Sequence, residues 1–321
     1  MLKHAKTSGI ADGGNTSLVQ PSDWNADHVV DTAGINFTGI DSSTVSTPAA
    51  DAATLRFQKL TGRDTPRIIT SLGMTSGGLQ CALEDRQLAY VQPLGHGSTS
   101  YTVFGTTGPT TVGTATGRTQ GTTSFFTRKR RVGYVSAATA GSLSGARITQ
   151  QTMMMGTLGG MGGFYCSITF GCSDAATVSG ARQFVGITNA ANAPTNVEPS
   201  TITSVFGVGH GAADTNLFIY PNGGSNAQTP IDLGANFPAN TLSTDVYRVS
   251  FYSPNNADYT IFWRVERLGT SFTASGSWVG TGTTDSFSTH VLSPLWAWRT
   301  NNATALAVGL DIMQVYFEAN V

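Results

Sequence analysis

Charged residues are scarce in this chain of 321 residues, which has only 18 Lys and Arg and 19 Asp and Glu. They make up 12% of the sequence, whereas an average soluble domain has about 25%. The formal net charge of -1 provides no overall attraction to nucleic acid or to an acidic membrane surface. We therefore expect no nucleic-acid partner.

Long apolar runs and cysteine are also scarce. No stretch of about 18 or more apolar residues occurs, and the N-terminal MLKHAKTSGIADGG lacks a signal-peptide core, so we expect no membrane insertion. Cys166 and Cys172 flank one expected strand, whose extended geometry holds their sulfurs too far apart to bond. With Cys81, they are expected to be free, largely buried thiols, consistent with assembly in a reducing cytoplasm.

Glycine, serine, threonine and asparagine are abundant, with Gly alone at 38 residues. Thr fits the pleat of a strand, while Gly and Asn supply the left-handed positions of tight turns, so the chain is predicted to be mostly β. From residue 128 to 321, strand-like segments such as RVGYVSA, DVYRVSFYS and DYTIFWRVERL alternate with turn clusters such as NGGSN. No helical periodicity separates them, which indicates an antiparallel β-sandwich or jelly-roll head.

Alternation within two of these segments predicts which side chains face a core. Residues on one face of a strand recur with a period of two. The predicted core faces are Phe164, Cys166, Ile168, Phe170 and Cys172 in the first segment, and Tyr259, Ile261, Trp263 and Val265 in the second.

The chain before residue 128 is divided into three parts. Residues 1–30 form a compact polar segment, and residues 31–94 show short patches without a sustained heptad, as in a neck or stalk. Residues 95–127 are a Gly/Thr-rich tract that is either a linker or a set of strands shared between copies. The recurring apolar residues Val103, Phe104, Val112, Phe125 and Phe126 favour a slender, intertwined β stalk.

A lone tryptophan stands out in the first of these parts. Trp24 lies among the turn-forming or helix-starting residues Pro21, Asp23 and Asn25, shortly before His28. A bulky aromatic side chain on so short a polar stretch needs a surface to pack against. It is either a terminal loop folded over its own domain or a peg that docks into a neighbouring protein.

Two segments resemble tailed-bacteriophage fibre or spike proteins. SLVQPSDWNADH, Ser17 to His28, resembles the opening of many tailed-phage fibre and virion proteins. RVGYVSAATAGSLSGARI, GGFYCSITFGC and NNATALAVGLDIMQVYFEA, within 131–321, are similar to the β-sandwich receptor-binding head of phage fibres. The resemblance implies a homotrimer in the virion that contacts the host surface. It also implies attachment to tail, portal-vertex or capsid proteins, with Pro21, Asp23, Trp24, Asn25 and His28 as the candidate residues.

Patterns that indicate catalysis or metal binding are weak. GTLGGMGGF has no lysine and hydroxyl residue after its glycines, the five histidines are scattered, and GSLSG, Gly141 to Gly145, lacks the flanks of a serine nucleophile. We therefore expect no catalytic residues, no metal and no cofactor. A polysaccharide depolymerase stays a third possibility, because paired carboxylates can be drawn from Asp214, Asp232, Asp245, Asp258, Glu266, Asp285 and Asp311.

Sugar recognition is predicted near the loops of the head, since aromatic rings stack on sugars and amides bind hydroxyls. The candidate ligand-binding residues are Asn255, Asn256, Tyr259 and Trp278. Trp296 and Trp298 fit a core as well as a site, and Arg128 to Arg131 is either a solvated connector or a patch for surface phosphates. The favoured function is non-covalent attachment to a host glycan, and the alternative is an architectural virion part such as a collar, baseplate or capsid decoration.

Overall fold

The computed structural model describes two compact units, Met1–Gln80 and Cys81–Val321. The described residues are 53–60, 63–70, 75–76, 86–157, 161–190, 192–224, 228–254, 259–280 and 291–320. Cys81 and the predicted attachment segment, with Pro21, Asp23, Trp24, Asn25 and His28, therefore lie outside the described residues. In the first unit, β1 (Ala53–Leu60), β2 (Arg63–Thr70) and β3 (Thr75–Ser76) form an antiparallel sheet in that order.

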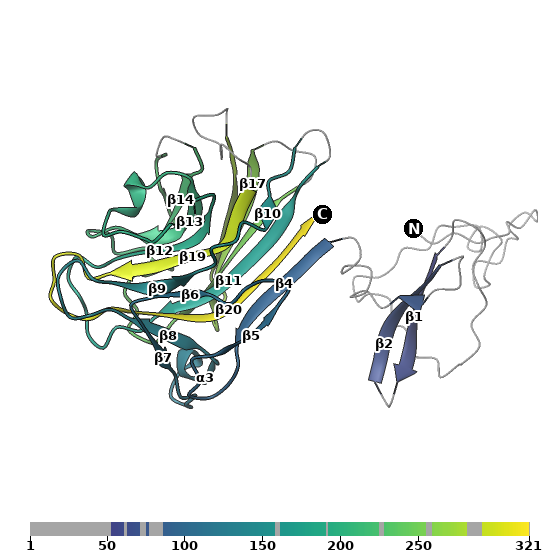
Figure 1. Cartoon of the computed structure of the whole chain (residues 1–321), viewed down its shortest axis with the longest axis horizontal. Coiled ribbons are helices and arrows are strands. Elements are labelled where there is room, and N and C mark those ends of the chain that lie inside the picture. Colours follow the sequence, from purple (N-terminus) through teal and green to yellow (C-terminus); the bar gives the residue numbers. More distant parts are fainter. Residues whose placement is uncertain are drawn as a thin grey trace, which may run out of the picture. The chain divides into compact units, whose positions relative to one another are not determined.

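The second unit contains two antiparallel sheets (Figure 1). The eight-stranded sheet has the order β15 (Ile231–Asp232), β14 (Phe218–Asn222), β13 (Val205–His210), β12 (Arg182–Thr188), β19 (Val291–Thr300), β9 (Leu143–Arg147) and β6 (Thr110–Val112), with β10 (Met153–Met154) also on β19. The nine-stranded sheet has the order β18 (Thr273–Val279), β17 (Thr260–Leu268), β16 (Val246–Ser253), β11 (Phe164–Cys172), β20 (Gly309–Asn320), β4 (Arg86–Pro93) and β5 (Tyr101–Phe104). β8 (Val132–Val135) also pairs with β20, and β7 (Thr114–Gly117) pairs with β8.

The main core lies between the two sheets, and the strand alternation predicts its composition well. Phe164, Cys166, Ile168 and Phe170 of β11 are buried in it, as are Ile261, Trp263 and Val265 of β17. These side chains meet residues of the eight-stranded sheet such as Val185 and Phe206. The prediction of a mostly β chain is confirmed, and so is that of free, buried thiols for Cys166 and Cys172.

A second, smaller core covers the opposite, outer face of the eight-stranded sheet. It consists of Phe184, Val205, Tyr220, Trp296 and Trp298. Neighbouring residues such as Val185, Ile219 and Ala297 belong to the main core, so β12, β14 and β19 are buried on both faces. Trp296 and Trp298 are therefore core residues, the first of the two roles that their spacing allows.

The Gly/Thr-rich residues 95–127 are part of the sandwich, where the sequence indicated a separate stalk. They form β5, β6, β7 and the short helix α3 (Phe125–Arg128), and their strands pair with β4, β9 and β8. Phe126 is buried beside Val246 and Met313 of the nine-stranded sheet. The tract needs little apolar surface because main-chain hydrogen bonds to earlier and later strands hold it. The sandwich thus includes β4, and the predicted boundary at residue 128 is wrong.

Candidate ligand-binding pocket

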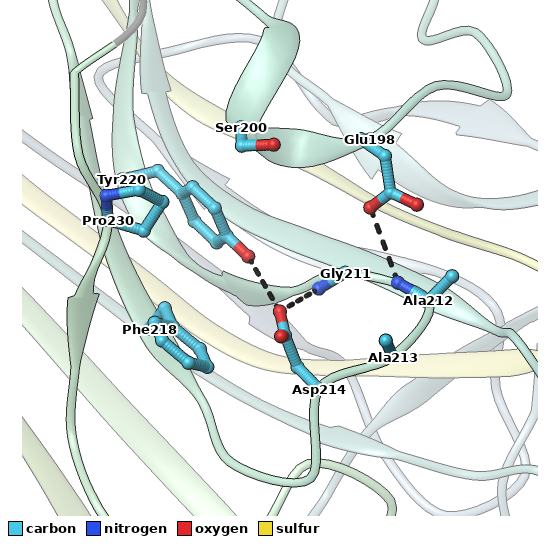
Figure 2. Close-up of a pocket in the computed structure, with 9 residues that line it drawn as sticks. All are labelled: Glu198, Ser200, Gly211, Ala212, Ala213, Asp214, Phe218, Tyr220 and Pro230. Atoms are coloured by element: carbon cyan, nitrogen blue, oxygen red, sulfur yellow. Dashed lines mark hydrogen bonds between the residues drawn. The ribbon is translucent and has the colours of Figure 1, made fainter.

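A pocket of about 370 Å³ opens on the outer face of the eight-stranded sheet, beside the second core (Figure 2). Its walls come from the short helix η1 (Pro199–Thr201) and the residue before it, from the turn that follows β13, and from β14. The lining residues are Glu198, Ser200, Gly211, Ala212, Ala213, Asp214, Phe218, Tyr220 and Pro230. The volume is that of a site for a small ligand.

Asp214 is the fixed polar group of this pocket. Its Oδ2 accepts hydrogen bonds from the Gly211 amide at 2.7 Å and from the Tyr220 hydroxyl at 3.4 Å. Burial raises the pKa of Tyr220 and the nearby charge of Asp214 adds to the shift, so the phenol keeps its proton and donates. Among the described residues, Oδ1 of Asp214 has no hydrogen-bond partner, and it remains available to a ligand.

Glu198 lies across the same turn. Its Oε1 accepts a hydrogen bond from Nε of Arg182 at 2.8 Å, and its Oε2 accepts from the Ala212 amide at 3.3 Å. A Cβ atom on Gly211 would lie 2.6 Å from Oε2 of Glu198 and 3.1 Å from Oδ2 of Asp214. A larger residue at position 211 would therefore displace the Glu198 carboxylate from the turn.

The turn is anchored from beneath by His210, a fully buried residue at the end of β13. Its Nε2 faces NH1 of Arg299, which can only donate, so the proton of the neutral ring sits on Nδ1 and is donated to the Gly211 carbonyl at 3.0 Å. Burial, together with the positive charge of Arg299, lowers the pKa of His210 to about 3. A neutral imidazole thus holds the first residue of the turn that lines the pocket.

The remaining walls provide donors and apolar surface. Among the described residues, neither the Ser200 hydroxyl nor the Ala213 amide has a hydrogen-bond partner. Phe218 and Pro230 supply apolar side chains beside the carboxylate of Asp214 (Figure 2). A carboxylate acceptor, two donors and an aromatic wall are the groups that match the hydroxyls and the apolar face of a sugar.

The sequence-based candidates lie elsewhere. Asn255 and Asn256 fall outside the described residues. Trp278 belongs to β18 in the other sheet and is half-buried, with its ring 5.7 Å from that of Phe206. Tyr259 is half-buried against the main core and has a left-handed backbone, with φ of 55°. Tyr259 and Trp278 thus contribute to packing and are not part of the Asp214 pocket.

The pocket residues were not identified from the sequence, apart from Asp214 among the acids considered for a depolymerase. The signal that identifies them is weak. A turn, GAAD, follows a buried strand and precedes Phe218 and Tyr220, which alternate on one face of β14. Glu198 enters from a separate loop, and linear sequence gives no reason to pair it with Asp214.

In the described part of the chain, no three or more His, Cys, Asp and Glu side chains gather as a metal site. No helix in that part has the length and apolar character needed to cross a membrane.

No family model matches this sequence, and no curated protein matches it either. Among solved structures, a protein of unknown function from Shewanella oneidensis is similar at 13% identity and a TM-score of 0.46, covering 78% of this chain and 96% of its own. Lectin II from Ulex europaeus is similar at 12% identity and a TM-score of 0.43, covering 66% and 93%. Peanut lectin follows at 10% identity and a TM-score of 0.41, covering 66% and 89%. At these values, the function of the chain has to be argued from its own residues.

Proposed function

We propose that this protein is a subunit of a bacteriophage fibre or spike, and that its sandwich binds a glycan of the host surface without cleaving it. The assignment to a virion rests on the resemblance of Ser17 to His28 and of residues 131–321 to phage fibre proteins. The assignment to a glycan rests on the pocket around Asp214.

The observation that carries the glycan assignment is the way Asp214 is held. Its Oδ2 is fixed by the Gly211 amide and the Tyr220 hydroxyl, which leaves Oδ1 without a hydrogen-bond partner among the described residues of this pocket. A preorganised acceptor of this kind costs little entropy on binding. The Phe218 ring beside it suits the apolar face of a pyranose.

The test is binding of the full-length chain to bacterial cells of candidate hosts, before and after the surface polysaccharide is stripped. Saturable binding that is lost on stripping supports the proposal. Asp214→Ala and Phe218→Ala are expected to weaken binding about tenfold or more, the loss of one good polar or stacking contact. Thr215→Ala is the matched control, because Thr215 is exposed beside the turn and does not line the pocket.

Other outcomes identify the alternatives. If a confirmed oligomer binds no host cells, the glycan role is wrong and an architectural place in the virion is favoured. Release of reducing ends from capsule or lipopolysaccharide, abolished by Glu198→Gln or Asp214→Asn, would instead identify a depolymerase. Glu198 and Asp214 flank one turn, which makes this third possibility specific enough to test.

The virion assignment has its own tests. As a homotrimer, the full-length chain is expected to scatter light with three times the mass of 33.5 kDa at micromolar concentration. A monomer would contradict the trimer. Deletion of residues 1–30 is expected to abolish incorporation into particles, and unchanged incorporation would contradict the attachment role of that segment.

A further inference from the structure

Two cavities adjoin on the outer face of the nine-stranded sheet. The Asp214 pocket lies on the other, eight-stranded sheet. One, of about 340 Å³, is lined by aromatic and hydroxyl side chains of β11, β16 and β17 together with Arg248, Arg264 and Glu266. The other, of about 250 Å³, is lined by residues of β4, β11, β16 and β20 and by the segment around α3. Arg248 of β16 lines both, so the two cavities meet at its side chain.

The smaller cavity is strongly cationic. Arg128, Lys129, Arg130 and Arg248 line it, and no Asp or Glu is among its lining residues. The nearest carboxylate to Arg248 is that of Glu266, 3.8 Å from NH1, and the same carboxylate accepts a hydrogen bond from Arg264 at 3.0 Å. One carboxylate therefore faces two guanidinium groups, and Arg128, Lys129 and Arg130 form no ion pair within the described residues.

The basic segment, Arg128 to Arg131, is held in place by its last residue. Arg131 is buried and forms an ion pair with Asp311 at 3.0 Å, while its NH1 donates to the carbonyls of Thr127 and Lys129. A capping box between Ser124 and Thr127 fixes the preceding turn. The backbone that carries Arg128, Lys129 and Arg130 is thus fixed before any ligand arrives.

The larger cavity offers surface for stacking. Tyr252 and Phe262 are 48% and 45% exposed, and their rings lie 6.2 Å apart on neighbouring strands. Beside them, the Tyr165 hydroxyl donates to Ser250 Oγ, which donates to Ser167 Oγ. Aromatic rings with hydroxyl groups beside them can stack on a sugar ring and bind its hydroxyls, so this lining suits a sugar chain better than it suits an inorganic ion.

We propose that this face is a second binding site, separate from the Asp214 pocket, and that its ligand is an acidic polysaccharide. A sugar ring would stack on Tyr252 and Phe262, and an anionic substituent of the chain would lie between Arg248 and the basic segment. Arginine binds carboxylate and phosphate by paired, charge-assisted hydrogen bonds. Because the two cavities share Arg248, they can bind successive sugar units of such a polysaccharide.

Three probes separate the components of this proposal. Polygalacturonate carries sugar rings and carboxylates, its methyl ester carries the rings without the charge, and polyphosphate carries the charge without the rings. The full-length chain is expected to bind polygalacturonate most tightly and to lose about tenfold or more of that affinity on esterification, since a charge-assisted bond is lost. Binding is also expected to weaken as salt is added.

The variants locate the site. Arg248→Ala is expected to weaken polygalacturonate binding about tenfold or more, and Tyr252→Ala to weaken it without changing the affinity for polyphosphate. Lys59→Ala removes the same unit of charge from β1 in the first unit and serves as the control for net charge. Thr215→Ala, at an exposed position that lines neither cavity, is expected to leave polygalacturonate binding unchanged.

Three results would overturn the proposal. The first is an absence of polygalacturonate binding. The second is equal binding of polygalacturonate and polyphosphate with no effect of Tyr252→Ala, which would show a simple anion site. The third is an equal effect of Arg248→Ala and Lys59→Ala, which would show attraction to net charge alone.

Discussion

Arg299 donates a hydrogen bond from NH1 to Nε2 of His210 at 2.8 Å, and neither side chain reaches solvent. The guanidinium is held by Asp174, which accepts from NH2 at 2.6 Å and from Nε at 2.9 Å. On its other side, the imidazole donates to the Gly211 carbonyl. A buried ion pair is therefore connected through one neutral ring to the turn that forms the floor of the Asp214 pocket.

The first prediction concerns the dependence of stability on pH. His210 has a folded pKa of about 3, below its value of about 6.5 in the unfolded chain, because burial and Arg299 disfavour its charged form. Below about pH 6.5 the unfolded chain binds a proton that the folded chain does not, so the free energy of unfolding falls as pH falls toward 3. The slope from this residue is about 1.4 kcal/mol per pH unit.

His210→Gln isolates this contribution, since the amide oxygen of glutamine can still accept from Arg299. Urea unfolding of both proteins between pH 7 and pH 4 is the measurement, and the difference between them is expected to shrink as pH falls. A constant difference would mean that His210 does not resist protonation in the folded chain.

The second prediction concerns Gly211. In Gly211→Ala, the new methyl group would lie 2.6 Å from Oε2 of Glu198, which is the end of a flexible side chain. Glu198 is expected to move away and to lose its hydrogen bond to the Ala212 amide, which destabilises the fold by about 0.5–1.5 kcal/mol and weakens glycan binding. In the background of Glu198→Ala the same substitution is expected to cost less, because the clashing carboxylate is gone. The measurement is thermal unfolding of the wild type, the two single variants and the double variant. An equal loss of stability from Gly211→Ala in both backgrounds would exclude the clash as the cause.

The third prediction concerns the buried ion pair. Arg299→Met leaves the buried Asp174 without its cation and is expected to destabilise the fold by about 3–5 kcal/mol. Arg264→Met breaks an exposed pair with Glu266 and is expected to cost about 0–1 kcal/mol. Urea denaturation compares the two, and similar losses would contradict the role assigned to Arg299.

The fourth prediction concerns thiol reactivity. Burial raises the pKa of Cys166 and of Cys172, so neither forms the reactive thiolate in the native fold. In a Cys81→Ser background, a thiol reagent is expected to label neither residue until urea is added. Rapid labelling of the native protein, checked by mass spectrometry, would show that β11 opens locally.

The sequence identified the core faces of β11 and β17 because bulky apolar side chains recur at every second position of each strand. It left Trp296 and Trp298 ambiguous for a different reason. β19 is buried on both faces, with Ala297 in the main core and the two tryptophans in the second one. Period-two alternation cannot reveal that a loop covers the outer face of a sheet, here through the bond from Trp296 Nε1 to the Asn192 carbonyl at 2.8 Å.

The tract 95–127 was assigned to a stalk because its composition supplies little apolar surface. Its strands are held by pairing with β4, β8 and β9, and main-chain hydrogen bonds leave no signature in a sequence. The candidate pocket was missed for a related reason. Glu198 and Asp214 come from different loops, and their carboxylates meet beside Gly211. The sequence alone does not show that Glu198 lies next to this glycine.

The position of β20 in the sheet affects how the protein folds while it is being synthesised on the ribosome. It follows every other strand in the chain, yet it lies in the interior of the nine-stranded sheet, between β11 on one side and β4 and β8 on the other. Until residues 309–320 emerge, β4 and β11 have no common partner, and main-chain groups along one edge of each strand stay without hydrogen-bond partners. Such distant pairing slows folding, so the nascent chain is expected to need protection from aggregation until β20 has emerged.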